Sequence, residues 1–123
     1  YTFFWRATPH PSLAVFDAPD AMVSCTRRSR SNTPLQALTL LNDQAFIEQA
    51  EALATRMATA AMDNDRERLD LGFRLCLARG PEEHELDILT ALLHDGGEGA
   101  PAESGWFRVA RTLLNLDEFI TRE

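Results

Sequence analysis

Residues Ser31 to Asp43 read SNTPLQALTLLND, and this stretch decides the fold because it holds a complete helix start. Thr33 is a good helix N-cap, Pro34 suits the first helical position, and Gln36 has the spacing of a capping box. The leucines that follow repeat at helical spacing, as expected for one face of a helix: Leu35, Leu38 and Leu41. The sequence therefore predicts a helix that begins at Pro34.

An apolar stripe extends this helix to about Met62, with inward positions at Leu38, Leu41, Ala45, Phe46, Ala50, Leu53, Met57 and Ala61. Asn42 and Asp43 interrupt the stripe, because Asn and Asp compete for backbone hydrogen bonds within a helix. The pattern is compatible with one long helix that is kinked near Asn42, and also with a break followed by recapping.

Three further helices are predicted, with connections at 63–65, 80–81 and 96–105. One runs from about Asp65 to Arg79, where Gly80 is expected in the left-handed C-terminal position. Pro81 is expected to start the next helix, which ends near Asp95, and Ser104 to cap the last. The prediction is an all-α fold, a small bundle of about four helices over 33–123, which together with 1–32 forms a single domain.

Residues 1–32 are predicted to be an irregular segment, because closely spaced prolines disfavour a continuous helix. The segment is rich in aromatic residues and prolines: Tyr1, Phe3, Phe4, Trp5, Phe16, Pro9, Pro11 and Pro19. These aromatics either cover the helices of this domain or pack against a neighbouring one. The chain begins without Met, and we expect it to be a fragment of a larger protein.

The composition makes nucleic-acid binding an unfavourable interpretation. The 123 residues carry a net charge of -7, and a uniformly acidic surface is repelled by phosphate. Every basic residue is Arg and none is Lys. No apolar run is long enough for a membrane span, so no membrane insertion is expected.

The sequence offers no metal or cofactor site, and no catalytic residue. The histidines lack metal-ligand spacing, and the two cysteines form neither a CxxC nor a CxxCH motif: His10, His84, His94, Cys25 and Cys76. We expect the cysteines to be a loop thiol and a buried helix thiol, with a disulfide between them as the alternative. Cofactors are therefore predicted to be absent from this chain.

Arg27, Arg28 and Arg30 lie just before the helix start and, with Asp17, are the candidate interaction residues. Guanidinium groups beside the free N–H groups of a helix start favour an anion or an acidic partner. The other interpretation is structural, with one or more of the arginines paired to Asp17, Asp20 or an acidic residue of a later helix.

Several motifs together resemble the DUF1553 family, also called PSD1. They are FDAPD at 16–20, Cys25 followed by the arginine cluster, NTPLQALTLLND at 32–43, RGPEEHE at 79–85 and LLNLDEF at 113–119. Many relatives have Pro after the LLND motif, whereas this chain has Gln44, which favours a continuous helix there.

The resemblance implies a parent architecture. Members occur chiefly in planctomycetes and related bacteria, and are large exported proteins with an upstream DUF1549 domain and often a cytochrome c domain. This chain would be the C-terminal part, an accessory domain of unknown biochemical function whose partners are the upstream domains. An exported, periplasmic or cell-surface location follows from the same resemblance. The alternative is a composite enzyme site, or an anionic-polysaccharide site, that the upstream domain completes.

Overall fold

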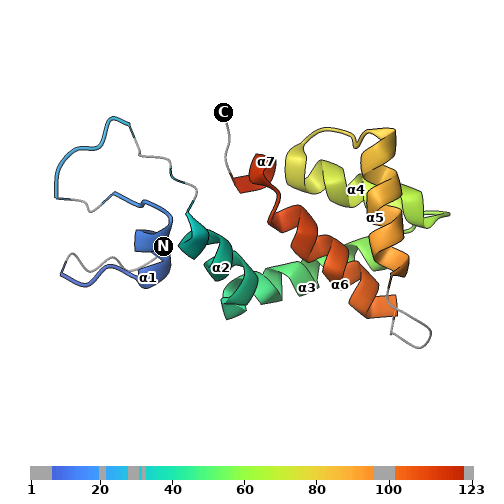
Figure 1. Ribbon diagram of the computed structural model, residues 1–123, viewed down its shortest axis with the longest axis horizontal. Coiled ribbons are helices and arrows are strands. Elements are labelled where there is room, and N and C mark those ends of the chain that lie inside the picture. Colours follow the sequence, from blue (N-terminus) through green and yellow to red (C-terminus); the bar gives the residue numbers. More distant parts are fainter. Residues whose placement is uncertain (1–6, 20–21, 28–30, 32, 96–101, 121–123) are drawn as a thin grey trace. The chain divides into compact units, whose positions relative to one another are not determined.

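The computed structural model describes residues 7–19, 22–27, 31, 33–95 and 102–120, with the side chains of 102–104 left out. Every regular element in these residues is a helix, which confirms the all-α prediction (Figure 1). The chain divides into two compact units, residues 1–39 and 40–123. No helix in these described ranges is long and apolar enough to cross a bilayer.

The first unit contains the short helix α1, Pro11–Val15, within the segment that was predicted to be irregular. Pro11 starts it, and the ring of His10 accepts a hydrogen bond from the backbone N–H of Ser12. Prolines that exclude a long helix are thus compatible with a single turn, because Pro is accepted at a first helical position. Tyr1, Phe3, Phe4 and Trp5 lie outside the described residues.

Helix α2, Pro34–Asn42, begins where the sequence predicted. The long helix does break: Asp43 has extended backbone and caps α3, Gln44–Ala58, by accepting a hydrogen bond from Ala45 N–H at 2.9 Å. Arg111 donates to the carbonyl oxygen of Leu41 at 2.8 Å and so satisfies the last turn of α2. Of the two alternatives, a break followed by recapping is the correct one, and the helix ends at Ala58, before the predicted end near Met62.

The break also explains why two predicted core leucines are exposed. Leu38 and Leu41 are 56% and 39% exposed, although the stripe placed them inward. An apolar stripe can be extended only along one continuous helix. Where α3 starts, the helix axis changes, so positions in α2 no longer face the same side as positions in α3. Leu40, by contrast, is buried.

Helix α4, Asp65–Leu77, begins at the Asn64 N-cap and is followed by α5, Glu83–His94. The left-handed residue at the end of α4 is Ala78, with φ 59°, whereas Gly80, which was predicted to take that conformation, does not. Pro81 lies before α5 and not within it. The N-cap of α5 is Glu82, which forms a capping box with Glu85.

Helices α6, Ala102–Leu114, and α7, Asp117–Ile120, complete the second unit. The start at Ala102 corrects the expected Ser104 cap. α3 and α6 share the largest helix interface, and α4 and α5 also pack on α6. The buried core comes from α3, α4, α5 and α6: Ala50, Ala54, Met57, Leu69, Phe73, Leu89, Trp106, Val109, Ala110 and Leu113.

One glycine is required by this packing. A Cβ on Gly105 would lie 2.4 Å from the carbonyl oxygen of Leu93, which is backbone and cannot move aside cheaply. Gly105 therefore allows α6 to approach the end of α5 closely, and this approach positions Trp106 and Phe107.

Candidate functional site

Gln36 is the centre of a hydrogen-bonded cluster in the first unit. Its side chain is 2% exposed and donates to the carbonyl oxygen of Val15 and to Ser31 Oγ, both at 2.8 Å. Its Oε1 accepts from the backbone N–H of Thr33, while Thr33 Oγ1 accepts from the backbone N–H of Gln36. The predicted capping box is confirmed.

Asp17 belongs to the same cluster, which we call the Gln36 junction (Val15, Asp17, Ser31, Thr33 and Gln36). Ser31 Oγ donates to Asp17 Oδ2 in a short hydrogen bond, and Gln36 Nε2 lies 3.4 Å from the same oxygen. Asp17 has a left-handed backbone, with φ 54°, directly after the turn that ends α1. The junction thus joins the FDAPD and NTPLQ motifs, and it engages the Asp17 carboxylate within the unit.

The arginine cluster is described only in part. Arg27 is exposed, and its carbonyl oxygen accepts a hydrogen bond from the Cys25 thiol. Arg28 and Arg30 lie outside the described residues. The anion-site interpretation of Arg27, Arg28, Arg30 and Asp17 therefore stays a prediction.

A second cluster, the Arg79 junction (Phe73, Arg79, Glu85 and Glu118), lies in the second unit. Arg79 makes two hydrogen bonds to Glu85, both at 2.9 Å, and two to Glu118, at 2.8 and 2.7 Å. Its guanidinium carbon lies 4.8 Å from the centre of the Phe73 ring. Bidentate geometry of this kind is specific to Arg. The junction joins the RGPEEHE and LLNLDEF motifs.

The charges of this junction shift one another. Hydrogen bonds from Arg79, assisted by the backbone N–H of Glu82, lower the pKa of Glu85 to about 2. Arg79 also lowers the pKa of Glu118, and the two carboxylates raise the pKa of Arg79. All three groups are therefore charged at neutral pH, and the lowered pKa makes each carboxylate a poor proton acceptor.

The residues predicted to be poor metal ligands are spread over both units. No group of three His, Cys, Asp or Glu side chains within the described ranges could hold a metal ion. Cys25 and Cys76 are both free thiols, so the alternative of a disulfide is not realised. Burial raises the pKa of Cys76, which keeps this thiol protonated and unreactive.

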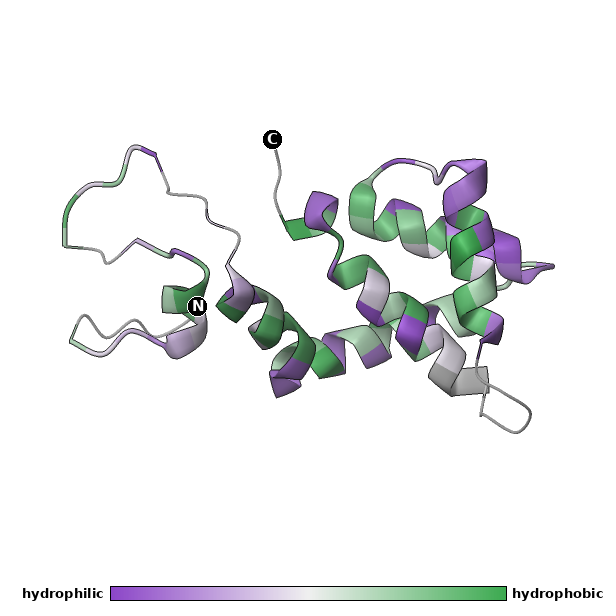
Figure 2. Cartoon of the chain, viewed as in Figure 1, coloured by the Kyte–Doolittle hydropathy of each residue, from purple (hydrophilic) through white to green (hydrophobic). Residues whose placement is uncertain are grey.

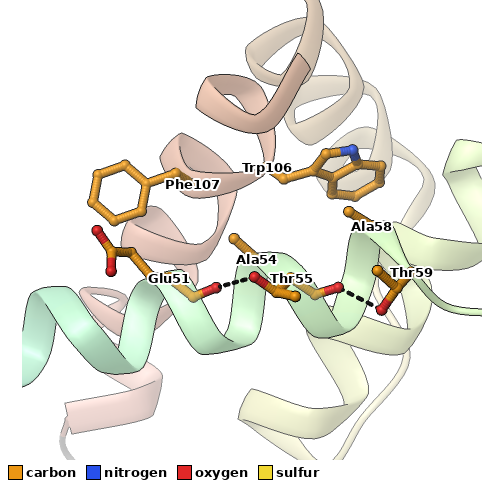
Figure 3. A pocket seen from close by; sticks show the side chains of 7 residues that line it. All are labelled: Glu51, Ala54, Thr55, Ala58, Thr59, Trp106 and Phe107. Carbon is orange, nitrogen blue, oxygen red and sulfur yellow. Dashed lines mark hydrogen bonds between the residues drawn. The ribbon is translucent and has the colours of Figure 1, made fainter. Parts of the chain in front are cut away.

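The described residues of the second unit line grooves on its surface. One of about 460 Å³ lies between α3 and α6, and Figure 3 shows the side chains that line it: Glu51, Ala54, Thr55, Ala58, Thr59, Trp106 and Phe107. A smaller, mostly apolar one of about 180 Å³ is lined by Leu40, Phe46, Ile47, Gln49, Ala50, Arg111, Leu114, Asn115 and Phe119. Sequence reasoning missed both, because a groove depends on which helices pack together.

Two similar segments of the sequence both contribute a residue to the smaller groove. ALTLLN followed by FI at 46–47 corresponds to ARTLLN followed by FI at 119–120, at a constant offset of 73 residues. Both segments end a helix and start another, and Phe46 and Phe119 both line this groove. Their similarity in sequence therefore corresponds to similar local geometry at the two breaks.

Comparison with known proteins gives one match. No curated protein and no solved structure matches the chain significantly. Residues 1–93 match the family model described as PSD1, protein of unknown function (DUF1553). This range includes the Gln36 junction and the Arg79 and Glu85 side of the Arg79 junction. The chain belongs to the PSD1 (DUF1553) family.

Proposed function

We propose that this chain is a non-catalytic, helical accessory domain that packs against upstream domains of the same polypeptide. The observation that carries the proposal is an exposed row of leucines on α2. Leu35 is 58% exposed and Leu38 is 56% exposed, both in the first unit, and we call these two the α2 leucine row. Figure 2 shows α2 as hydrophobic along most of its length.

A leucine row is more useful for association than for chemistry. Fully burying one Leu side chain stabilises an association by roughly 1.5–3 kcal/mol, and these side chains still have half or so of that surface to bury. The carboxylates with the strongest local contacts, Asp17, Glu85 and Glu118, are meanwhile engaged within the chain. Binding through α2 is therefore better supported than catalysis at these carboxylates.

The capping box supports this role for α2. Thr33 and Gln36 fix the start of the helix, so its leucines are presented from a defined position and less entropy is lost on binding. Arg27, Arg28 and Arg30 precede the helix and would supply charged contacts at the edge of the same interface. Such contacts set orientation and association rate more than affinity.

The partner in this proposal comes from the family resemblance. Relatives have an upstream DUF1549 domain and often a cytochrome c domain, in large exported proteins. We take the upstream DUF1549-like domain as the partner, and an exported location for the whole polypeptide. The haem chemistry of such a protein would belong to other domains.

Hydrogen exchange tests the proposal directly. The amides of α2 are compared in the isolated 123-residue chain and in the full-length polypeptide, and we expect slower exchange in the latter. Leu35→Ser with Leu38→Ser should remove that added protection, and calorimetric binding to the separate upstream domain should weaken at least tenfold. Arg27→Ala with Arg28→Ala and Arg30→Ala should weaken it less, mainly by slowing association.

Ile88→Ser is the matched control, because Ile88 is 63% exposed on α5 and lies outside the α2 leucine row. It should leave both α2 exchange and the affinity unchanged. Equal exchange of α2 in the isolated and full-length proteins would reject the interface. A similar loss of affinity with Ile88→Ser would place the contact on another surface.

A further inference from the structure

The groove between α3 and α6 combines a small apolar floor with aromatic walls and one polar ridge. Ala54 and Ala58 form the floor, and Trp106 and Phe107 come from the facing helix (Figure 3). Its volume of about 460 Å³ lies within the range of small-molecule sites in proteins, roughly 300–1,000 Å³. All of its lining residues belong to the second unit.

The polar ridge can accept hydrogen bonds but donates none to the groove. Thr55 Oγ1 donates its proton to the carbonyl oxygen of Glu51 at 2.9 Å, and Thr59 Oγ1 donates to that of Thr55 at 2.7 Å. Both hydroxyl groups therefore keep only lone pairs for a ligand. The carboxylate of Glu51 is also an acceptor. The polar ridge, which consists of Glu51, Thr55 and Thr59 at successive turns of α3, therefore favours a ligand that donates hydrogen bonds.

The aromatic walls reinforce a preference for positive charge. Figure 3 shows the Glu51 carboxylate beside the Phe107 ring, and the indole nitrogen of Trp106 on the ring edge farther from α3. A cation near an aromatic face is attracted by the ring quadrupole. None of the salt bridges within the described residues involves Glu51.

A basic side chain near the Phe107 ring, Arg111, does not fill the groove. Arg111 lies over the Phe107 ring, with its guanidinium carbon 5.6 Å from the ring centre. It is held by the carbonyl oxygen of Leu41 and is not among the residues that line the groove. The Glu51 carboxylate is therefore left for an external cation.

We propose that this groove binds a small protonated primary alkylamine, a function separate from domain packing. The ammonium group would donate to the Glu51 carboxylate at one end of the groove, and the alkyl chain would lie along Ala54 and Ala58 between the aromatic rings. The carboxylate of Glu51 and the net charge of -7 both disfavour an anion. No Lys occurs in the 123 residues, so such a group comes from outside this stretch.

The test is a fluorescence titration with n-hexylamine at pH 7, where an alkylamine is protonated. Trp106 reports on the groove, and Trp5→Phe removes the only other indole. We expect saturable binding, weakened at least tenfold by Glu51→Gln. Calorimetry on the unsubstituted chain gives the same affinity without relying on the Trp5 variant.

Glu48→Gln is the matched control, since Glu48 is an exposed carboxylate on α3 that accepts from Gln44 at 2.8 Å and does not line the groove. It should leave the affinity unchanged, and 1-hexanol and hexanoate should bind at least tenfold more weakly than the amine. Equal binding of 1-hexanol, or an unchanged affinity in Glu51→Gln, would overturn the proposal. Tighter binding of Nα-acetyl-lysine-amide than of hexylamine would also overturn it, in favour of a protein side chain as occupant.

Discussion

The Gln36 junction and the Arg79 junction both join motifs that are distant in sequence, but they do so with different chemistry. At the first, a buried neutral amide links the turn after α1 to the start of α2. At the second, a partly exposed guanidinium links the connection after α4 to α5 and α7. The comparison separates a junction that depends on burial from one that depends on charge.

The difference has an energetic consequence. A buried amide that loses its partners leaves several polar groups unsatisfied away from water, whereas exposed ionic groups that lose a partner are resolvated. We therefore expect substitutions at Gln36 to cost more than substitutions at Arg79. Only the Arg79 junction should respond strongly to acid and to salt.

The largest effect is expected for Gln36→Leu. Leucine fills similar space but leaves the Val15 carbonyl, Ser31 Oγ and the Thr33 N–H without the amide. We expect this to cost about 1–3 kcal/mol in the free energy of local opening, measured by hydrogen exchange at the amides of α1 and residues 16–18.

Gln49→Leu is the control, because Gln49 is an exposed glutamine on α3. Its substitution should leave exchange in α1 unchanged. If Gln36→Leu also had no effect there, the capping box alone, and not the contact with the α1 turn, would explain why this position carries Gln.

The next effect is the acid sensitivity of the second unit. The pKa of Glu85 is about 2 in the folded state, against an ordinary value of 4.5, so its stabilisation is present above about pH 4.5 and lost towards pH 2. Arg79→Met removes the partner that lowers this pKa. We expect the Tm of the variant to fall less steeply than that of the wild type between pH 5 and 2.

Arg74→Met is the matched control for this measurement. Arg74 belongs to α4 and pairs with Asp70 one turn away, at 2.7 Å. Its removal should leave the acid slope of the wild type nearly intact. An Arg79→Met chain with the full wild-type slope would show that other carboxylates control acid unfolding.

The sequence predicted local features better than the junctions. Thr33, Pro34 and Gln36 gave the start of α2 correctly, because a capping box depends on residues within one turn. The same Gln36 side chain also bonds to the Val15 carbonyl, 21 residues earlier, and no local pattern shows such a contact. The spacing of Leu69, Gly72 and Phe73 is likewise that of one helix face, and all three are buried in α4.

The errors occurred where tertiary contacts outweigh local preference. A left-handed residue is strained by roughly 1–2 kcal/mol unless it is Gly, so Gly80 was the natural choice for the end of α4. The helix ends instead at Ala78, beside the Arg79 that contacts Phe73, Glu85 and Glu118. We infer that these contacts offset the strain at Ala78. The α3–α6 groove was missed for a similar reason, since Glu51 and Trp106 are 55 positions apart.

The smallest expected effect is on salt dependence, and it separates the two junctions most cleanly. Raising NaCl from about 0.05 M to about 1 M shortens the Debye length from roughly 14 Å to roughly 3 Å, which screens exposed ion pairs but not buried neutral hydrogen bonds. The difference in Tm between wild type and Arg79→Met should therefore narrow, while that between wild type and Gln36→Leu stays constant. Because both differences are taken at the same salt concentration, general salt effects on hydrophobic burial cancel. Equal narrowing for both variants would mean that the charge of Asp17 contributes to the Gln36 junction as strongly as the guanidinium does at Arg79.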